Sequence, residues 1–237
     1  MLLALKNIFY IMEESAMPKP GLPRRYLIFL GGVIFTALGV ALITLAGMGT
    51  SAVSSLSYVL TFVFPGISFG TFTFIVNASM VVGQILVLRR EFKPLQLLQL
   101  PATFLFSVSL DLWMYLLGAL TPQSYPGRWV FLLLGCICLG IGVALEVLPD
   151  VLILPCEGFV NVVSRKYRWD FGLVKTIYDV AMVVSAAIVS LACTGQIHGL
   201  REGTLVTALI VGVISRFCCK HLAFLMSVRG GGQPHPC

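Results

Sequence analysis

The chain has very few charged residues, and one long stretch has none. No Asp, Glu, Lys or Arg occurs from Tyr26 to Leu88. Charged residues make up only 11% of the chain, whereas hydrophobic residues make up 58%. A soluble domain cannot leave so long a stretch uncharged, but a bilayer accepts about 20 apolar residues in each helix that crosses it. The sequence therefore excludes a soluble protein and predicts an integral membrane protein.

Motifs of enzymes and of metal sites are also missing. The chain has no HExxH motif and no P-loop. None of its seven Cys residues forms a CxxC pair, and most lie in apolar segments where a thiol packs as a small hydrophobic group. We therefore expect no enzymatic activity, no catalytic residues, no metal and no cofactor. The net charge of +6 comes from residues at the ends of apolar runs, which argues against a nucleic-acid partner.

The apolar segments predict an all-α, polytopic membrane protein. Two of them, 51–64 and 151–164, have about 14 residues, which rise about 21 Å and fall short of a ~30 Å hydrocarbon core. Helix breakers surround both: Gly47 and Gly49 precede the first, and Pro155 enters the second. We expect these two to be short re-entrant helices. The other segments predict six transmembrane helices, at about 26–46, 70–88, 95–118, 129–148, 173–193 and 203–221.

The distribution of basic residues supports six crossings. If neither short segment crosses, 14 of the 16 Lys and Arg residues lie on one side, and only Arg128 and Arg201 lie on the other. Basic residues collect on the cytoplasmic side of membrane proteins. This count, which includes Lys175, predicts that both termini are cytoplasmic. If both short segments crossed, the asymmetry would be weaker.

The sequence contains an internal repeat. Residues 39–42, Gly-Val-Ala-Leu, recur at 142–145, and Arg25 meets Arg128 at the same offset. Slightly later, Asn77 meets Asp179. Three crossings per half invert one repeat relative to the other, which is a recurring plan of secondary transporters. We expect a cytoplasmic tail at 1–24, a first repeat at 25–118, an external loop at 119–127, a second repeat at 128–221 and a cytoplasmic tail at 222–237.

Polar residues near the two short segments are candidates for binding a solute or an ion. Thr50 and Ser51 follow a glycine turn, where they either help to bind an anion at the helix start or only cap the helix. Glu157 lies just after Pro155 and before Gly158. A carboxylate at membrane depth is costly and is therefore a functional candidate, although an interfacial position is the alternative.

Asp179 is the second acidic candidate, because it lies inside an apolar segment and corresponds to Asn77 in the other repeat. Its alternative role is a structural hydrogen bond between helices. Thr50, Ser51, Asn77, Glu157 and Asp179 are expected to line one polar cavity near the membrane midplane. Pro155, Gly158, Arg201 and Glu202 are candidates for capping or gating.

Five short motifs make the chain resemble the YczE/YitT group of predicted bacterial membrane proteins, most closely its YczE-like branch. They are residues 38–42, the Gly-Thr-Ser turn at 49–51, Phe92–Gln99, the Pro-Cys-Glu-Gly turn at 155–158, and Arg201–Thr204. Two positions depart from the pattern of the group: Ala52 replaces a usual Pro, and Cys156 replaces a usual Gly. The resemblance implies a bacterial cytoplasmic membrane but no particular activity.

The architecture leads to two hypotheses about function. The first is a small-solute secondary transporter or permease with a midplane site between the repeats. The second is a non-transporting accessory or regulatory protein that contacts another membrane protein through its helices. The expected partners are the lipid bilayer and either a small solute or a proton, and the sequence is compatible with a homo-oligomer. A transporter needs polar residues around an interior cavity, whereas an accessory protein would present small residues to the lipid.

Overall fold

The computed structural model describes residues 21–92, 94–196, 199 and 201–222. The predicted tails lie almost entirely outside this part of the chain. Over the described residues the fold is all helical, as predicted, and contains no strand. Its helices are α2 (Leu22–Leu45), α3 (Ser55–Val63), α4 (Phe69–Leu88), α5 (Gln99–Gly118), α6 (Tyr125–Val147), α7 (Pro155–Tyr167), α8 (Phe171–Thr194) and α9 (Glu202–Leu222), with 3₁₀ turns at Arg89–Glu91 and Pro94–Leu98.

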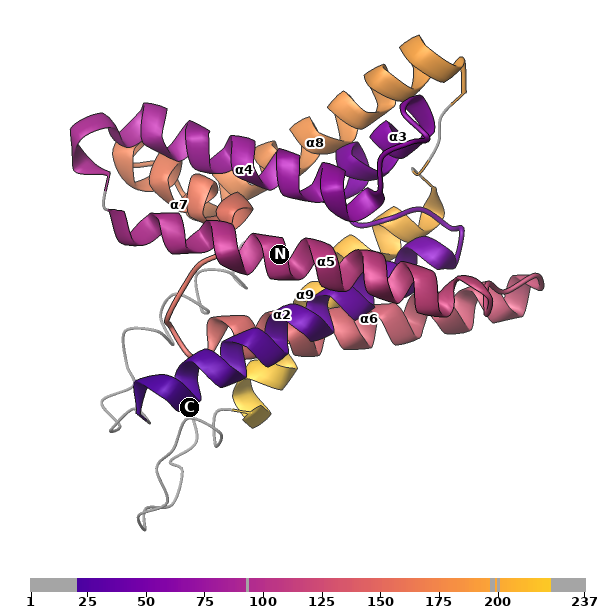
Figure 1. Cartoon of the computed structure of the whole chain (residues 1–237), viewed down its shortest axis with the longest axis horizontal. Helices are drawn as coiled ribbons and strands as arrows, with labels where there is room; N and C mark the ends of the chain where they lie inside the picture. The colour runs from indigo at the N-terminus through magenta and orange to yellow at the C-terminus, as the bar shows by residue number, and fades with distance from the viewer. Residues whose placement is uncertain (1–20, 93, 197–198, 200, 223–237) are drawn as a thin grey trace.

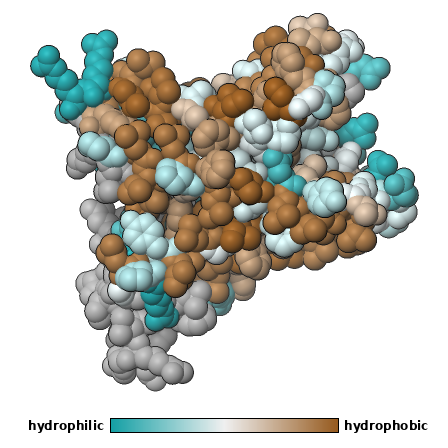
Figure 2. Space-filling view, viewed as in Figure 1, coloured by the Kyte–Doolittle hydropathy of each residue, from teal (hydrophilic) through white to brown (hydrophobic). Residues whose placement is uncertain are grey.

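Six of these helices are long and apolar enough to cross a membrane: α2, α4, α5 with the turn before it, α6, α8 and α9. Hydrophobic residues cover most of the face seen in Figure 2, and hydrophilic residues gather mainly at its two ends. The number of long apolar helices agrees with the prediction. The two short helices, α3 and α7, fall within or close to the two short segments, and α7 begins at Pro155, where a proline fits the first helical turn.

The helices pack into two bundles, each of which takes helices from both halves of the chain. In the first bundle, α2 packs against α5 and α6, and α6 packs against α9. In the second bundle, α3 and α7 each pack against both α4 and α8. The second bundle lies above the first in Figure 1, and the main contact between them joins α4 to α5.

Glycines let the backbones of α2 and α6 approach closely in the first bundle. A Cβ atom added to Gly39 would lie 2.4 Å from the backbone nitrogen of Leu139, and one added to Gly142 would lie 2.5 Å from the backbone nitrogen of Thr36. Small residues serve this purpose between membrane helices, where dispersion contacts replace the hydrophobic effect. The small-residue face of α2 is therefore covered by α6.

We expect the Gly39→Ala variant to be clearly less stable than the unaltered protein, because its Cβ meets backbone rather than a flexible side chain. Overpacking costs roughly 1–3 kcal/mol, and a backbone clash belongs at the upper end. Gly31→Ala is the matched control on the same helix, since apart from the neighbouring backbone of α2 no atom lies within 4 Å of its added Cβ. Thermal unfolding of the purified proteins in detergent measures both. Equal melting temperatures would mean that α2 and α6 do not pack this closely.

The two ends of the molecule are named here after two arginines. The Arg25 side carries the start of α2 and the end of α9, and the Arg128 side carries the end of α2 and the start of α6; they are the left and right ends of Figure 1. The short helix α7 lies toward the Arg25 side and α3 toward the Arg128 side. Their starts share one core, since Val53, just before α3, packs against the buried cluster that contains Cys156 of α7.

Candidate functional site

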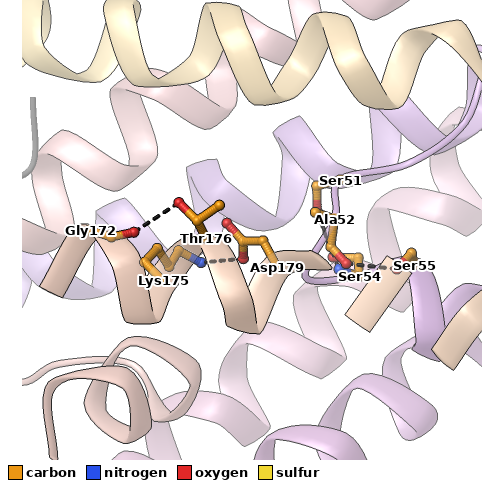
Figure 3. Close-up of polar contacts among 8 residues, drawn as sticks. All are labelled: Ser51, Ala52, Ser54, Ser55, Gly172, Lys175, Thr176 and Asp179. Carbon is orange, nitrogen blue, oxygen red and sulfur yellow. Dashed lines mark hydrogen bonds and ion pairs between the residues drawn. The ribbon is translucent and has the colours of Figure 1, made fainter. Parts of the chain in front are cut away.

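Lys175 and Asp179 form an ion pair inside the second bundle. They lie one turn apart on α8, and Lys175 Nζ donates to Asp179 Oδ1 at 2.7 Å. The two side chains are only 15% and 26% exposed. The charge count includes Lys175 among the basic residues on the cytoplasmic side. In the structure it is the fifth residue of α8 and the partner of Asp179 (Figure 3). The i,i+4 spacing was the signal for this pair in the sequence.

Glu157 brings a third ionisable group to this pair. It lies in the first turn of α7, which is not one of the six long helices and which packs against α8. Burial raises the pKa of Glu157, the positive charge of Lys175 lowers it, and the negative charge of Asp179 raises it. We call Glu157, Lys175 and Asp179 the acid–lysine cluster. With two acids and one base, the cluster has one carboxyl group in excess, which can accept a proton or a cation.

A buried amide pair fixes the start of α7 against α4 and α5. Gln84 is fully buried, and its Nε2 donates to Gln99 Oε1 and to the Pro155 carbonyl, both at 3.0 Å. Gly158 leaves the space for these amides, since a Cβ there would lie 3.0 Å from Gln84 Nε2. Pro155 and Gly158 thus position α7. Sequence reasoning missed both glutamines, although Gln84 stands out as an amide in the uncharged stretch.

The remaining binding candidates have their own local partners. Thr50 is fully buried, with its Oγ1 3.1 Å from that of Thr44. Ser51 Oγ donates to Ser54 Oγ at 3.0 Å, and Asn77 Nδ2 donates to the Thr73 carbonyl at 2.9 Å. Within the described residues, no hydrogen bond or ion pair joins Thr50, Ser51 or Asn77 to Glu157 or Asp179. Packing of α3 against α8 nevertheless brings the turn at 51–55 to the region of the ion pair (Figure 3).

A pocket of about 360 Å³ opens on the Arg128 side, between the end of the first bundle and α3. Arg201 lies in its wall and donates from Nη1 to the Gly47 carbonyl at 3.4 Å. Glu202 begins α9 next to it, and the N–H of Gly203 donates to the Met48 carbonyl at 2.9 Å. The residues that line the pocket are Thr44, Leu45, Ala46, Gly47, Gly49, Tyr58, Phe62, Thr121, Pro122, Arg128, Gly199 and Arg201.

Arg25 occupies the corresponding place on the opposite side of the molecule. Its Nε donates to the Pro149 carbonyl at 2.7 Å, and its Nη2 donates to the Asp150 carbonyl at 2.6 Å. These contacts tie the start of α2 to the loop between α6 and α7. At the repeat offset of Arg25 and Arg128, Pro149 and Asp150 correspond to Ala46 and Gly47, which line the pocket beside Arg128.

Residues 66–70, Gly-Ile-Ser-Phe-Gly, match the pattern around hydrolase nucleophiles, but Ser68 caps a helix here. Its Oγ accepts from the N–H of Thr71 at 3.1 Å and donates to Asp111 Oδ2 at 2.6 Å. Asp111 also accepts from the N–H of Gly70 at 2.7 Å. A nucleophilic serine needs a neighbouring base such as histidine, and within the described part of the chain no histidine contacts Ser68. The motif therefore indicates helix capping.

Comparison with known proteins identifies the family. A family described as "Family of unknown function (DUF6198)" matches residues 23–220. The uncharacterized membrane protein YczE of Bacillus subtilis (strain 168) is 27% identical over 201 residues, which cover 84% of this chain and 87% of that protein. No solved structure matches the chain. The resemblance to YczE-like membrane proteins is thus confirmed, and the chain belongs to the family of unknown function DUF6198.

Proposed function

We propose that this protein is a secondary transporter or permease for a small solute, without enzymatic activity. The acid–lysine cluster is the observation that carries the proposal. Ionisable side chains within membrane proteins are costly and usually serve the movement of ions, protons or substrates. Here the charges of Lys175 and Asp179 on α8 act on Glu157 at the start of α7, which packs against α8. The exterior of the protein is largely apolar. The excess carboxyl group makes a proton the expected coupling ion.

The packing pattern supports two inverted repeats with α3 and α7 as re-entrant helices. The repeat makes α2, α3, α4 and α5 correspond to α6, α7, α8 and α9. The contact of α2 with α5 then corresponds to that of α6 with α9, and the contact of α3 with α8 corresponds to that of α7 with α4. All four contacts occur in the structure. Val53 and Cys156, which correspond at the repeat offset, pack in the same core. Meeting of equivalent positions is what a two-fold axis in the membrane plane requires.

One contact breaks this correspondence and supports alternating access. The helices α4 and α5 pack together, whereas their counterparts α8 and α9 have no comparable contact. The Arg25 side chain donates to two carbonyls, whereas the Arg128 side chain lies in an open pocket and makes no hydrogen bond to the described residues. The structure then corresponds to a state open on the Arg128 side. In the second state α8 would pack against α9, α4 would separate from α5, and the Arg25 side would be open.

The orientation follows from the basic residues. Apart from Arg128 and Arg201, the basic residues of the described helices and turns lie on the Arg25 side or on the half of α8 nearest to it. We place the Arg25 side in the cytoplasm and the protein in the bacterial cytoplasmic membrane, with both termini cytoplasmic. The alternative, an accessory protein, would need a small-residue face open to lipid. The glycines of α2 and α6 instead face each other, which favours the transporter.

Distances between spin labels test the proposal without a known substrate. One label pair lies on exposed positions of α8 and α9, Ile188 and Leu205, and a second lies on exposed positions at α4 and before α5, Leu86 and Leu98. In lipid vesicles we expect two distances for each label pair, one from each state of the protein. In the state where one pair is close together, the other pair should be far apart. A single fixed distance for both pairs would contradict alternating access and favour the accessory protein.

A further inference from the structure

We propose that the pocket on the Arg128 side binds a small anion that carries carboxylate or phosphate groups, held by Arg128 and Arg201. This inference rests on the proposed function, because it names the substrate class that the outward-open state would admit. Arg128 and Arg201 are the two basic residues that the charge pattern places outside, and both line this one pocket.

The chemistry of the pocket wall matches an anion. No carboxylate belongs to the residues that line it, and within the described part of the chain neither Arg128 nor Arg201 forms an ion pair. Arginine presents several N–H donors in a planar fork that fits carboxylate and phosphate oxygens in pairs. Arg201 uses one nitrogen on the Gly47 carbonyl, which fixes the side chain and leaves its other donors for a ligand.

Tyr58 adds a neutral donor to the same wall. Burial raises the pKa of Tyr58, so its hydroxyl group remains protonated and does not add a repelling negative charge. Its ring packs edge-on against Phe62 and Phe69, with centroid distances of 5.0 and 5.4 Å, which fixes the side chain on α3. Tyr58 belongs to the second bundle and Arg128 to the first, so one anion in the pocket would contact both bundles.

The contrast with Arg25 shows that Arg128 does not serve as a structural brace here. Arg25 satisfies its guanidinium with two loop carbonyls. Arg128 has the corresponding carbonyls of Ala46 and Gly47 in the same pocket but donates to neither in this structure. An unpaired guanidinium in a pocket of about 360 Å³ has room for a ligand of modest size.

Binding of succinate and of inorganic phosphate to the purified protein in detergent tests the site. Calorimetry at low ionic strength is expected to show saturable binding of at least one of them. We expect Arg128→Gln and Arg201→Gln each to weaken it about tenfold or more, as loss of a charge-assisted hydrogen bond does. Arg128→Lys keeps the charge but loses the fork, and we expect an intermediate affinity. Arg24→Gln is the matched control, an exposed arginine on the opposite side.

Two results would overturn the inference: no saturable binding of either anion, or equal weakening by Arg24→Gln and Arg128→Gln. Melting temperatures of the variants without ligand show whether each variant is folded. If neither anion binds but the spin labels still report two states, the anion site fails while the transporter stands. If an anion binds through Arg128 and the distances are fixed, the site stands and the transporter fails.

Discussion

The Asp179→Asn variant is expected to reach the membrane in near-normal amount and to lose transport. Asn keeps the shape of the side chain but removes the charge that pairs with Lys175 at 2.7 Å. The pair is partly exposed, so the stability cost should stay below the ~3–5 kcal/mol seen when a fully buried pair is broken. Uptake of labelled succinate and phosphate into vesicles under an inward proton gradient measures the loss, which we expect to exceed tenfold.

A charge-exchanged variant separates a transport role from a structural one. Lys175→Asp combined with Asp179→Lys restores an ion pair at the same spacing but reverses its direction along α8. If the pair only stabilises the bundle, the double variant should recover both the melting temperature and the uptake. If Asp179 takes part in transport, stability should recover without uptake. Normal uptake by Asp179→Asn itself would reduce this acid to a hydrogen-bonding role.

Glu157→Gln probes the proton in the same cluster. Because burial raises the pKa of Glu157, the unaltered carboxyl group keeps its proton to a higher pH than an ordinary glutamate. Gln resembles the protonated form at every pH. Uptake by the variant should therefore change less than that of the unaltered protein as the pH rises through the pKa of Glu157. An unchanged pH profile would exclude Glu157 as the coupling group.

Arg25→Gln is expected to open the Arg25 side, because it removes both hydrogen bonds that tie α2 to the loop after α6. Leu152 lies in that loop and packs against the core of the first bundle. A cysteine that replaces it reports the opening in a background without other reactive thiols. A membrane-impermeant thiol reagent added from the cytoplasmic side should label it several times faster in the Arg25→Gln background. Loss of two charge-assisted bonds is large enough to shift a two-state equilibrium by about tenfold or more.

Arg24→Gln is the control for this experiment, since Arg24 is adjacent and exposed and its side chain makes no hydrogen bond within the described part of the chain. It should leave the labelling rate unchanged. Labelling from the external side only would reverse the proposed orientation. Equal rates in both variants would mean that the Arg25 contact is a permanent brace rather than part of a gate.

The sequence alone predicted the parts of the fold that depend on local composition. Uncharged apolar runs predicted the six long helices and the two short segments. The second short segment was predicted to begin at residue 151, but α7 begins at Pro155, because a proline fits the first turn of a helix. The partition into two bundles depends on contacts between distant segments and leaves no trace in hydropathy. The Gln84–Gln99 pair was not predicted for the same reason, since it forms only when α4 and α5 lie side by side.

The candidate site was predicted only in part for a similar reason. Glu157 and Asp179 stand out as acids next to or inside apolar segments. Lys175 was only counted among the basic residues of one side, and its ion pair with Asp179 was not predicted. Arg128 and Arg201 are 73 positions apart. Each therefore appeared as an isolated external charge, and only the folded chain brings them to one pocket.

The sharing of both bundles between the two halves has a consequence for biosynthesis. When the first half has left the ribosome, α2 still lacks α6, and the glycine face that α6 will cover remains exposed. Neither half can complete a core alone, so assembly must wait until the second half has entered the bilayer. A gene divided between Gly118 and Tyr125 would then yield two fragments that are degraded when made separately and that stabilise each other when made together.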